Sequence, residues 1–511
     1  MKGQIDLCEV EQRVLLAPAV KKSATRLCGG GFLLIVVALM GLFVLDAVER
    51  RWLAQTPWHG AIRTVDYAME DPEAMTVWSW ELTPQQSVGD SELAQIVQRD
   101  LLRMIDLEEK APERLREESP VVALSSTDML DEALLPRARL LMFAGDASVF
   151  ETVLDSGRLP VPGQPEVLAG PLVSERPLEL DGVTYTVVGR LHPYVSGFVK
   201  TFVMPEDEAL RTALSASLKM DTGSVHLTGV ARVAELIPVA EGDAERVLPV
   251  VYGGQPMTRP DIAWGVWTAL LVVASGATCC FMGLFRYLTL WNLGFLNVVF
   301  QEIELRRRLL WSLYVTLFGA FFWAMAVGMQ DIEMNYLFTE FASHEFTEGG
   351  LQYVGDAYKS GNIPRAAQAT FQNNFVMQTV MLGALPSLVL LGVGVLKTLA
   401  SFVVVGFAMA PVWSGTASGM TYHAITLALE LPPYVLAAFG MIVWAIAAAR
   451  FVWSPVQVWY LGDKASEVSV IEEAARQLPR ALLTLVGTVA IAALFLYIAA
   501  WYEAATLILF R

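Results

Sequence analysis

Four side chains that could take part in proton or solute chemistry gather in one apolar part of the chain. Asn373 and Asn374 stand directly before an apolar run, and His423 and Glu430 precede another. An unpartnered polar group in hydrocarbon costs roughly 2–7 kcal/mol, so such residues need a structural or functional reason. They could line a polar pocket or a path for a small solute or protons. Alternatively, Asn374 and Glu430 cap helix ends and hydrogen-bond across a helix bundle.

The same residues fall short of a catalytic set. A zinc hydrolase needs about three ligands and a base, whereas this region offers one histidine, His423, and one glutamate, Glu430. The sequence contains no H-E-x-x-H, G-x-S-x-G or Walker A motif. We therefore expect no enzyme, no metal and no cofactor.

Composition indicates where such residues would lie. Of 511 residues, 54% are hydrophobic and 17% are charged, against roughly 25% charged residues in soluble domains. This predicts an α-helical polytopic membrane protein with at least one soluble part. The formal net charge of −16 argues against a nucleic-acid partner, which would require a basic surface. The four cysteines lie outside the long polar region, so no disulfide framework is expected there.

Apolar runs separated by polar segments predict about seven membrane spans. The first run, 32–48, has about the minimum length for a span. Because no A-x-A-like cleavage site follows it, we expect an uncleaved signal anchor after a cytoplasmic segment, 1–31. The other expected spans are 262–284, 309–329, 375–396, 399–412, 431–449 and 481–500.

The spans group into larger units. Segment 262–329 supplies two spans joined by a basic cytoplasmic loop, and 371–450 forms a membrane core that holds the four polar side chains. Segment 330–370 is acidic, glycine-broken and rich in aromatic residues, which predicts either an interfacial segment or a solvated loop. After 412 a polar, small-residue loop is expected to carry His423. Pro432-Pro433 is expected to break the next segment, and 451–480 to form a cytoplasmic loop.

An α+β domain is expected over 50–260, between the first and second spans, because this is the only long polar block. The run 183–188 alternates and is β-branched, which predicts a strand. Asp181-Gly182 directly before it is a hairpin turn signal.

Basic residues predict the orientation of these units. The loops expected on the same side of the membrane as the N-terminus carry arginines, including Arg306, Arg307 and Arg308. The loop 413–422, expected on the other side, has no lysine or arginine. By the positive-inside rule the N-terminus is cytoplasmic and the 50–260 domain is extracytoplasmic. The four polar side chains then lie near the outer face.

The three arginines end an amphipathic stretch, 295–308. This stretch is either a surface helix whose arginines touch anionic lipid headgroups or a helix that couples to a cytoplasmic ATPase.

Small residues four apart predict close contacts between helices in the bundle. The two pairs are Gly406 with Ala410 and Ala445 with Ala449.

Part of the outer domain resembles the periplasmic core domain of MacB/FtsX-type ABC transporter permeases, over about residues 151–205. That resemblance implies a unit of glycine turn, strand, hairpin and strand, although Pro177-Leu178-Glu179 stands where the family has Gly-Asp. The residues that carry it are Gly157-Arg158-Leu159-Pro160, Gly163-Gln164-Pro165-Glu166-Val167-Leu168 and Asp181-Gly182-Val183-Thr184-Tyr185-Thr186-Val187-Val188-Gly189.

The membrane core resembles the stage II sporulation protein M (SpoIIM) family of integral membrane proteins, over roughly 300–450. Thr426 stands where the family commonly has a histidine before its glutamate, so the resemblance singles out Asn374 and Glu430 more than His423. The residues that carry it are Phe371-x-x-Asn374, Gly383, Gly392, Gly394, Glu430-Leu431-Pro432 and Gly440.

Together the two resemblances imply a multi-pass protein of a bacterial cytoplasmic membrane. The first hypothesis is a non-enzymatic, SpoIIM-like scaffold or assembly partner whose outer domain contacts other envelope proteins. The second is a permease-like subunit of an ABC-type transport or mechanotransmission system driven by a separate ATPase, because this chain has no Walker A loop of its own.

Overall fold

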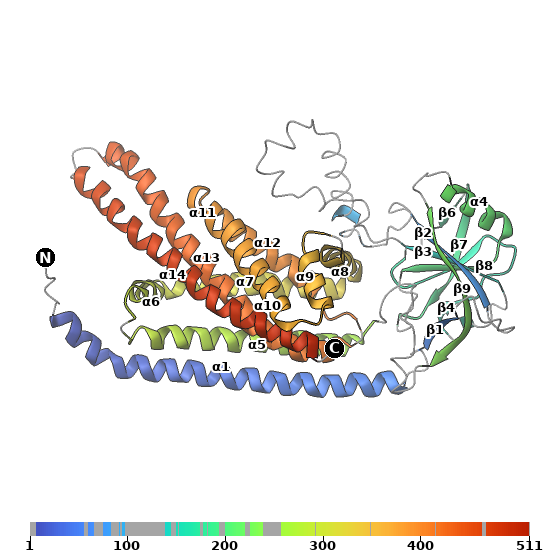
Figure 1. The fold of residues 1–511 in the computed structure, drawn as a ribbon, viewed down its shortest axis with the longest axis horizontal. Coiled ribbons are helices and arrows are strands. Elements are labelled where there is room, and N and C mark those ends of the chain that lie inside the picture. Colours follow the sequence, from blue (N-terminus) through green and yellow to red (C-terminus); the bar gives the residue numbers. More distant parts are fainter. Residues whose placement is uncertain are drawn as a thin grey trace.

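A long helical bundle with a mixed β-sheet domain at one end forms the computed structural model of the protein (Figure 1). The sheet domain lies where the first long helix ends and the second begins. The structure describes residues 7–509 apart from 56–59, 66–74, 83–90, 92, 94, 98–137, 145–149, 152, 174–176, 181, 194–199, 220–224, 239–256, 292, 348, 414 and 462–466.

Five helices of the described part are long and apolar enough to cross a membrane, as a multi-pass membrane protein requires. A sixth apolar helix, α12, is shorter. The five are α1 (Leu7–Gln55), α5 (Pro260–Leu288), α7 (Arg307–Gln330), α13 (Thr416–Leu461) and α14 (Glu467–Leu509).

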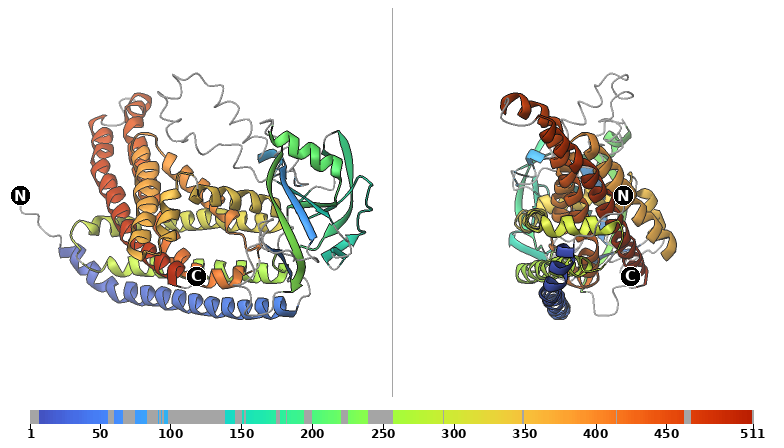
Figure 2. Two further views of the ribbon diagram at one scale, coloured as in Figure 1. Left: turned by 45° about the vertical axis from the view of Figure 1, so that its right-hand side comes forward. Right: turned by 90° about the vertical axis from the view of Figure 1, so that its left-hand side faces the viewer.

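Helices α1 and α5 run side by side along most of their length, and α13 and α14 form a second pair that crosses them obliquely (Figures 1 and 2). Gly276 shows why α1 can lie so close to α5. A Cβ atom there would come within 2.6 Å of the Gly31 carbonyl oxygen and 2.8 Å of Ile35 Cγ1. Only glycine permits this approach, which brings small residues of two helices into direct backbone contact.

The apolar stretch after residue 371 forms a helical hairpin, and its turn differs from the expected one. The turn lies at 390–392, where Gly392 adopts a φ of 90°. Ser387 Oγ accepts the Gly394 N–H at 3.0 Å and donates to the Gly383 carbonyl at 2.9 Å. The hairpin consists of η4 (Gln372–Ala384), a π-helical segment, then α11 (Leu385–Val389) and α12 (Val393–Ala408).

Lys397, which lies between the two expected spans 375–396 and 399–412, is therefore inside α12 and not in a turn. Its ammonium group donates to the Gln378 side-chain oxygen and to the Gln378 carbonyl across the hairpin. Glycine and serine form the turn instead, because one adopts the left-handed conformation and the other satisfies the backbone.

Helix α13 corrects two further expectations. It is continuous through 417–430, so His423 lies on a helix and not in a polar loop. It also continues through Pro432 and Pro433 without ending. Proline is tolerated inside membrane helices because neighbouring helices stabilise the segment. The expected loop 451–480 is likewise mostly helical, since α13 reaches Leu461 and α14 begins at Glu467.

Segment 330–370 is helical and packs on the bundle. Asn335 is fully buried and donates to the Phe407 carbonyl at 2.7 Å, at the last turn of α12. Phe338 stacks on the Phe407 ring with centroids 5.0 Å apart. The segment consists of α8 (Ile332–Thr347), α9 (Gln352–Lys359) and α10 (Ile363–Phe371).

The sheet domain contains a nine-stranded sheet in the order β1-β9-β2-β3-β8-β5-β7-β4, with β6 paired to β7. Pairs β3–β8 and β5–β7 are parallel, and the other pairs are antiparallel. Its elements are β1 (Gly60–Val65), β2 (Met75–Leu82), β3 (Arg139–Ala144), β4 (Leu154–Gly157), β5 (Glu166–Ala169), β6 (Leu178–Leu180), β7 (Val183–Leu191), β8 (Thr201–Pro205), α4 (Glu208–Lys219) and β9 (Val225–Pro238).

The expected hairpin is confirmed. Leu180 pairs with Val183 across a two-residue turn, and Gly182 in that turn has a φ of 76°. A positive φ is what a tight hairpin turn requires.

Contacts of the described residues join the sheet domain and the segments next to it to the bundle. Ser91 Oγ donates to Asp331 at 2.5 Å, just before α8. The Lys200 ammonium lies 5.4 Å from the ring centroid of Tyr336 in α8. The Thr258 N–H donates to the Val412 carbonyl at 2.7 Å.

Candidate functional site

The structure brings three of the four predicted polar side chains together in the bundle. Asn374 Nδ2 donates to Glu430 Oε1 at 2.5 Å, from η4 to α13. Asn373 Nδ2 donates to Asn374 Oδ1 at 3.0 Å. Neither Asn374 nor Glu430 caps a helix end, because Asn374 lies within η4 and Glu430 lies about 20 Å along α13 from its first residue. The bond across the bundle is present without the capping role.

His423 does not join this group. It lies on the same face of α13 as Glu430, seven residues nearer the start, which is about 10 Å along the helix. In the part of the chain that the structure describes, its ring forms no hydrogen bond or ion pair. Its position on a helix face, and not in a flexible loop, keeps it two turns from the carboxylate.

The backbone on both sides of the Asn374–Glu430 bond is irregular. Around Asn374 the chain is π-helical, a rare form that is frequent at functional sites. The Asn374 carbonyl accepts the Thr379 hydroxyl at 2.8 Å. In α13, Pro432 and Pro433 remove two helical N–H donors and so leave the carbonyls one turn earlier without their usual partners. Polar backbone atoms thus add to the polarity of this place.

Glu503 is a second carboxylate at the same place, and the sequence reasoning missed it. It lies in the last part of α14, within electrostatic range of Glu430. The residue as a whole keeps part of its surface exposed. An acid within an otherwise apolar helix was the available signal.

Two tyrosines complete the surroundings. Tyr434 lies one turn after Glu430 and its hydroxyl donates to Glu430 Oε1 at 3.4 Å. Tyr358 in α9 lies within electrostatic range of both carboxylates, and its hydroxyl is 3.0 Å from Thr370 Oγ1. We call Asn373, Asn374, Glu430, Tyr434 and Glu503 the Glu430 site.

Among the residues that the structure describes, no lysine, arginine or histidine interacts with the carboxylates of the Glu430 site. The groups that interact with its carboxylates are amides, hydroxyls and each other. Lys397, the nearest lysine along the hairpin, is bonded to Gln378 instead. The described residues also contain no group of three or more His, Cys, Asp or Glu side chains that could hold a metal ion.

Glu49 has a different environment, at the end of the bundle next to the sheet domain, where it joins helix ends. Glu49 of α1 is 1% exposed and accepts the Thr258 hydroxyl at 2.5 Å. It also accepts the Ala417 N–H at 3.3 Å, at the first turn of α13. A carboxylate at a helix N-terminus satisfies a free backbone donor and complements the helix dipole. Glu49 therefore joins three chain segments.

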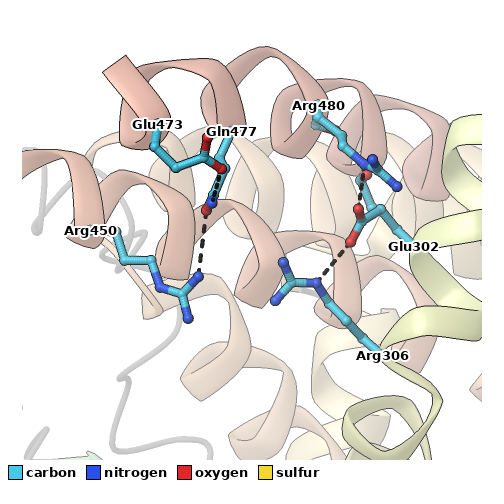
Figure 3. A network of polar contacts seen from close by, with 7 residues as sticks. Glu302, Arg306, Arg450, Glu473, Gln477 and Arg480 are labelled. Atoms are coloured by element: carbon cyan, nitrogen blue, oxygen red, sulfur yellow. Dashed lines mark hydrogen bonds and ion pairs between the residues drawn. The ribbon is translucent and has the colours of Figure 1, made fainter. Parts of the chain in front are cut away.

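At the opposite end, the three predicted arginines differ in their surroundings, and Figure 3 shows those of Arg306. Glu302, which is 5% exposed, accepts Arg306 at 2.8 Å and Arg480 of α14 at 2.5 Å. We call Glu302, Arg306 and Arg480 the Glu302 clamp. Arg307 pairs with Glu304 at 3.1 Å. Arg308 is exposed and forms no ion pair with a described residue.

Glu302 lies in α6 (Leu296–Leu305), a short helix between α5 and α7. The clamp therefore ties a connecting helix to the last long helix of the chain. Figure 3 also shows Arg450 near Gln477, which joins α13 to α14 at 3.4 Å, and Glu473 accepts the Gln477 amide at 3.2 Å.

Of the two predicted pairs of small residues, one lies at a close contact between helices and the other does not. A Cβ atom on Gly406 would lie 2.9 Å from Ala324 Cβ of α7, and one on Gly328 would lie 3.0 Å from Ala410 Cβ. Helices α12 and α7 are thus in close contact along this pair. Ala445 is half-buried and Ala449 is exposed, so the second pair does not lie at a buried helix contact.

Comparison with other proteins adds no relative. No family model, curated protein or solved structure matches this chain.

Proposed function

We propose that the protein is a non-enzymatic, SpoIIM-like integral membrane protein that acts as a cell-envelope scaffold or assembly partner. Its 50–260 domain lies outside a bacterial cytoplasmic membrane and binds other envelope proteins, and its N-terminus is cytoplasmic. The chain crosses the bilayer about seven times, with the five long helices joined by the two limbs of the hairpin.

One observation carries this proposal: the sheet domain is fixed to the bundle at several points. Ser91 bonds to Asp331, and the Lys200 ammonium, next to β8, lies 5.4 Å from the ring centroid of Tyr336 in α8. A domain that is held at a set position outside the bilayer suits a platform for partners better than a freely tethered binding module.

The orientation has its own support. The junction of α6 and α7, which carries Arg306, Arg307 and Arg308, lies at the end of the bundle away from the sheet domain, and Arg480 of α14 pairs with Glu302 there. Under the positive-inside rule that end is cytoplasmic. Cysteine-accessibility labelling of a substituted site in β7 and of one near Arg308 would test this, and labelling of both from the same side would contradict it.

The scaffold role is tested with the intact chain. Crosslinking in the native membrane, followed by purification in mild detergent, is expected to recover envelope proteins joined through residues 139–238. The matched control places the crosslinker at Val389, an exposed apolar residue at the hairpin turn. A chain that yields no protein adduct from the sheet domain beyond the control would contradict the proposal.

A second function, a permease-like subunit driven by a separate ATPase, rests on α6. This helix lies between two long helices at the arginine-rich end, and the Glu302 clamp links it to α14. Such a link could pass movement of a cytoplasmic partner into the bundle. Co-purification with a nucleotide-binding subunit would support it. If charge reversal at Arg306, Arg307 and Arg308 changes only the topology, and no ATPase activity accompanies the complex, this function fails.

A further inference from the structure

The turn of the hairpin formed by η4, α11 and α12 exposes apolar side chains. Val389 is 81% exposed, Leu390 59% and Leu391 42%. Every residue from 380 to 396 is apolar except Ser387, whose side chain is fully buried. A turn that reaches the membrane surface usually carries charged residues, or tryptophan and tyrosine as interfacial anchors. The sequence of this turn contains neither, so it is suited to apolar surroundings.

The backbone of the turn is satisfied without water. The N–H groups of Leu390 and Val393 donate to carbonyls within the turn at 2.8 and 3.1 Å. The Leu388 carbonyl accepts the indole N–H of Trp444 in α13 at 3.3 Å. The two bonds of Ser387 described above connect the limbs on either side of the turn. Irregular backbone can lie at membrane depth only where its polar groups have partners, and this turn meets that condition.

Helix α13 gives the depth of the turn. Glu430 bonds to Asn374 near the beginning of the hairpin, and Trp444 bonds to its turn. These two residues of α13 are 14 residues apart, which is about 21 Å along the helix. Arg450, the next charged residue of α13, lies 20 residues after Glu430, or about 30 Å, which equals the thickness of a hydrocarbon core. The turn therefore lies about 9 Å short of Arg450, measured along α13.

The size of the hairpin agrees with this depth. Helix α12 has 16 residues and is about 24 Å long, less than the roughly 30 Å of the hydrocarbon core. Figures 1 and 2 show that α13 and α14 extend well beyond α11. Lys397 does not require cytoplasmic water, because its ammonium group donates to the side chain and the carbonyl of Gln378 in the other limb.

We propose that the hairpin 372–408 is re-entrant: it enters and leaves the bilayer through the outer face, and its turn contacts lipid acyl chains. Acyl chains are the partner of Val389 and Leu390, because the turn offers exposed apolar side chains and no free backbone group for a polar partner. This refines the proposed count of about seven crossings, since the five long helices cross completely and the two limbs enter without crossing. The side of entry rests on the proposed topology, whereas the depth of the turn does not.

Spin labels on the full-length protein in lipid nanodiscs test the depth. The four native cysteines are replaced by serine, and a label is attached at V389C. This label is expected to collide often with oxygen, which dissolves in hydrocarbon, and rarely with a water-soluble nickel chelate. The matched reference is V452C, because Val452 is 69% exposed and lies two residues after Arg450. The ratio of oxygen to nickel collisions should be higher at V389C than at V452C.

An equal or lower ratio at V389C would overturn the proposal, because the turn would then reach the membrane surface. If the serine background does not fold, benzoylphenylalanine is placed at position 389 of the chain with its native cysteines. Illumination is expected to give adducts with lipid, and adducts with protein alone would overturn the proposal. A failure to crosslink envelope proteins would contradict the scaffold role without changing either result, so the two proposals fail separately.

Discussion

Two glutamates of the bundle, Glu302 and Glu430, differ in the groups that hold their carboxylates. Glu302 lies between two guanidinium groups, those of Arg306 and Arg480. Among the described residues, the donors to Glu430 are the amide of Asn374 and the phenol of Tyr434. A carboxylate held by two cations has its charge fixed by its neighbours, so its role is to join helices. A carboxylate held by neutral donors can gain or lose a proton, so its protonation can be a function.

The largest difference in stability between variants of the two glutamates is expected at the Glu302 clamp. E302Q would leave the guanidinium groups of Arg306 and Arg480 without their shared anion. Breaking a buried ion pair costs about 3–5 kcal/mol. Because both arginines remain partly exposed to solvent, we expect about 2–3 kcal/mol of lost stability here. Thermal unfolding in detergent would measure it, with E304Q as the control on the same helix. If E302Q unfolds at the same temperature as the wild type, the Glu302 clamp does not stabilise the fold and the contrast with Glu430 fails.

A smaller effect is expected from the amide that holds Glu430. N374A removes the 2.5 Å hydrogen bond to Glu430, while Tyr434 still donates to the same oxygen. Hydrogen bonds to charged groups contribute about 1.5–3 kcal/mol, and the remaining donor reduces the expected loss to about 1–2 kcal/mol. The control N373A removes only the bond between the two asparagines. A larger loss in N373A than in N374A would mean that the bond to Glu430 is not what stabilises this place.

Removal of the charge at Glu430 is expected to have little effect on stability. E430Q keeps the size of the side chain and can still accept the Asn374 amide. It also removes an acid that no cation of the described residues faces. We expect a change within about 1 kcal/mol in either direction. The same unfolding measurement as for E302Q gives the comparison directly. If E430Q loses as much stability as E302Q, the two glutamates are alike and the distinction drawn above fails.

The smallest effect on stability is expected from Glu166 in the sheet domain, and this effect depends on pH. In the sheet domain, the hydrogen bonds from Arg158 and the Val161 N–H hold the pKa of Glu166 at about 2, below its ordinary 4.5. A lowered pKa stabilises the fold above the unfolded value, so this contribution is complete above about pH 4.5. It is lost as the pH falls toward 2.

Hydrogen exchange of β5 checks this expectation, with wild type and E166Q compared at each pH. The wild type should be better protected from pH 7 to 5, and the difference should vanish near pH 2. A difference that stays constant down to pH 2 would contradict it.

The site was partly predictable from sequence. Asn374 and Glu430 stood out because polar residues beside apolar runs are costly to bury, and the structure joins them directly. Glu503 did not stand out, because a single acid near the end of the last apolar helix also fits an interfacial position. Its relation to Glu430 depends on how α13 and α14 pair, and sequence spacing 73 residues apart carries no such information.

The sequence by itself determined the class of protein and the local elements that depend on nearest neighbours. Long apolar runs require membrane-spanning helices, and Asp181-Gly182 beside a β-branched run requires a hairpin turn. The tertiary structure decided the rest. It moved the turn from Lys397 to Gly392, carried α13 through Pro432, and brought Glu503 to Glu430. These outcomes depend on which helices pack together, because a neighbouring helix supplies the partners that decide whether a polar group or a proline can remain inside a bundle.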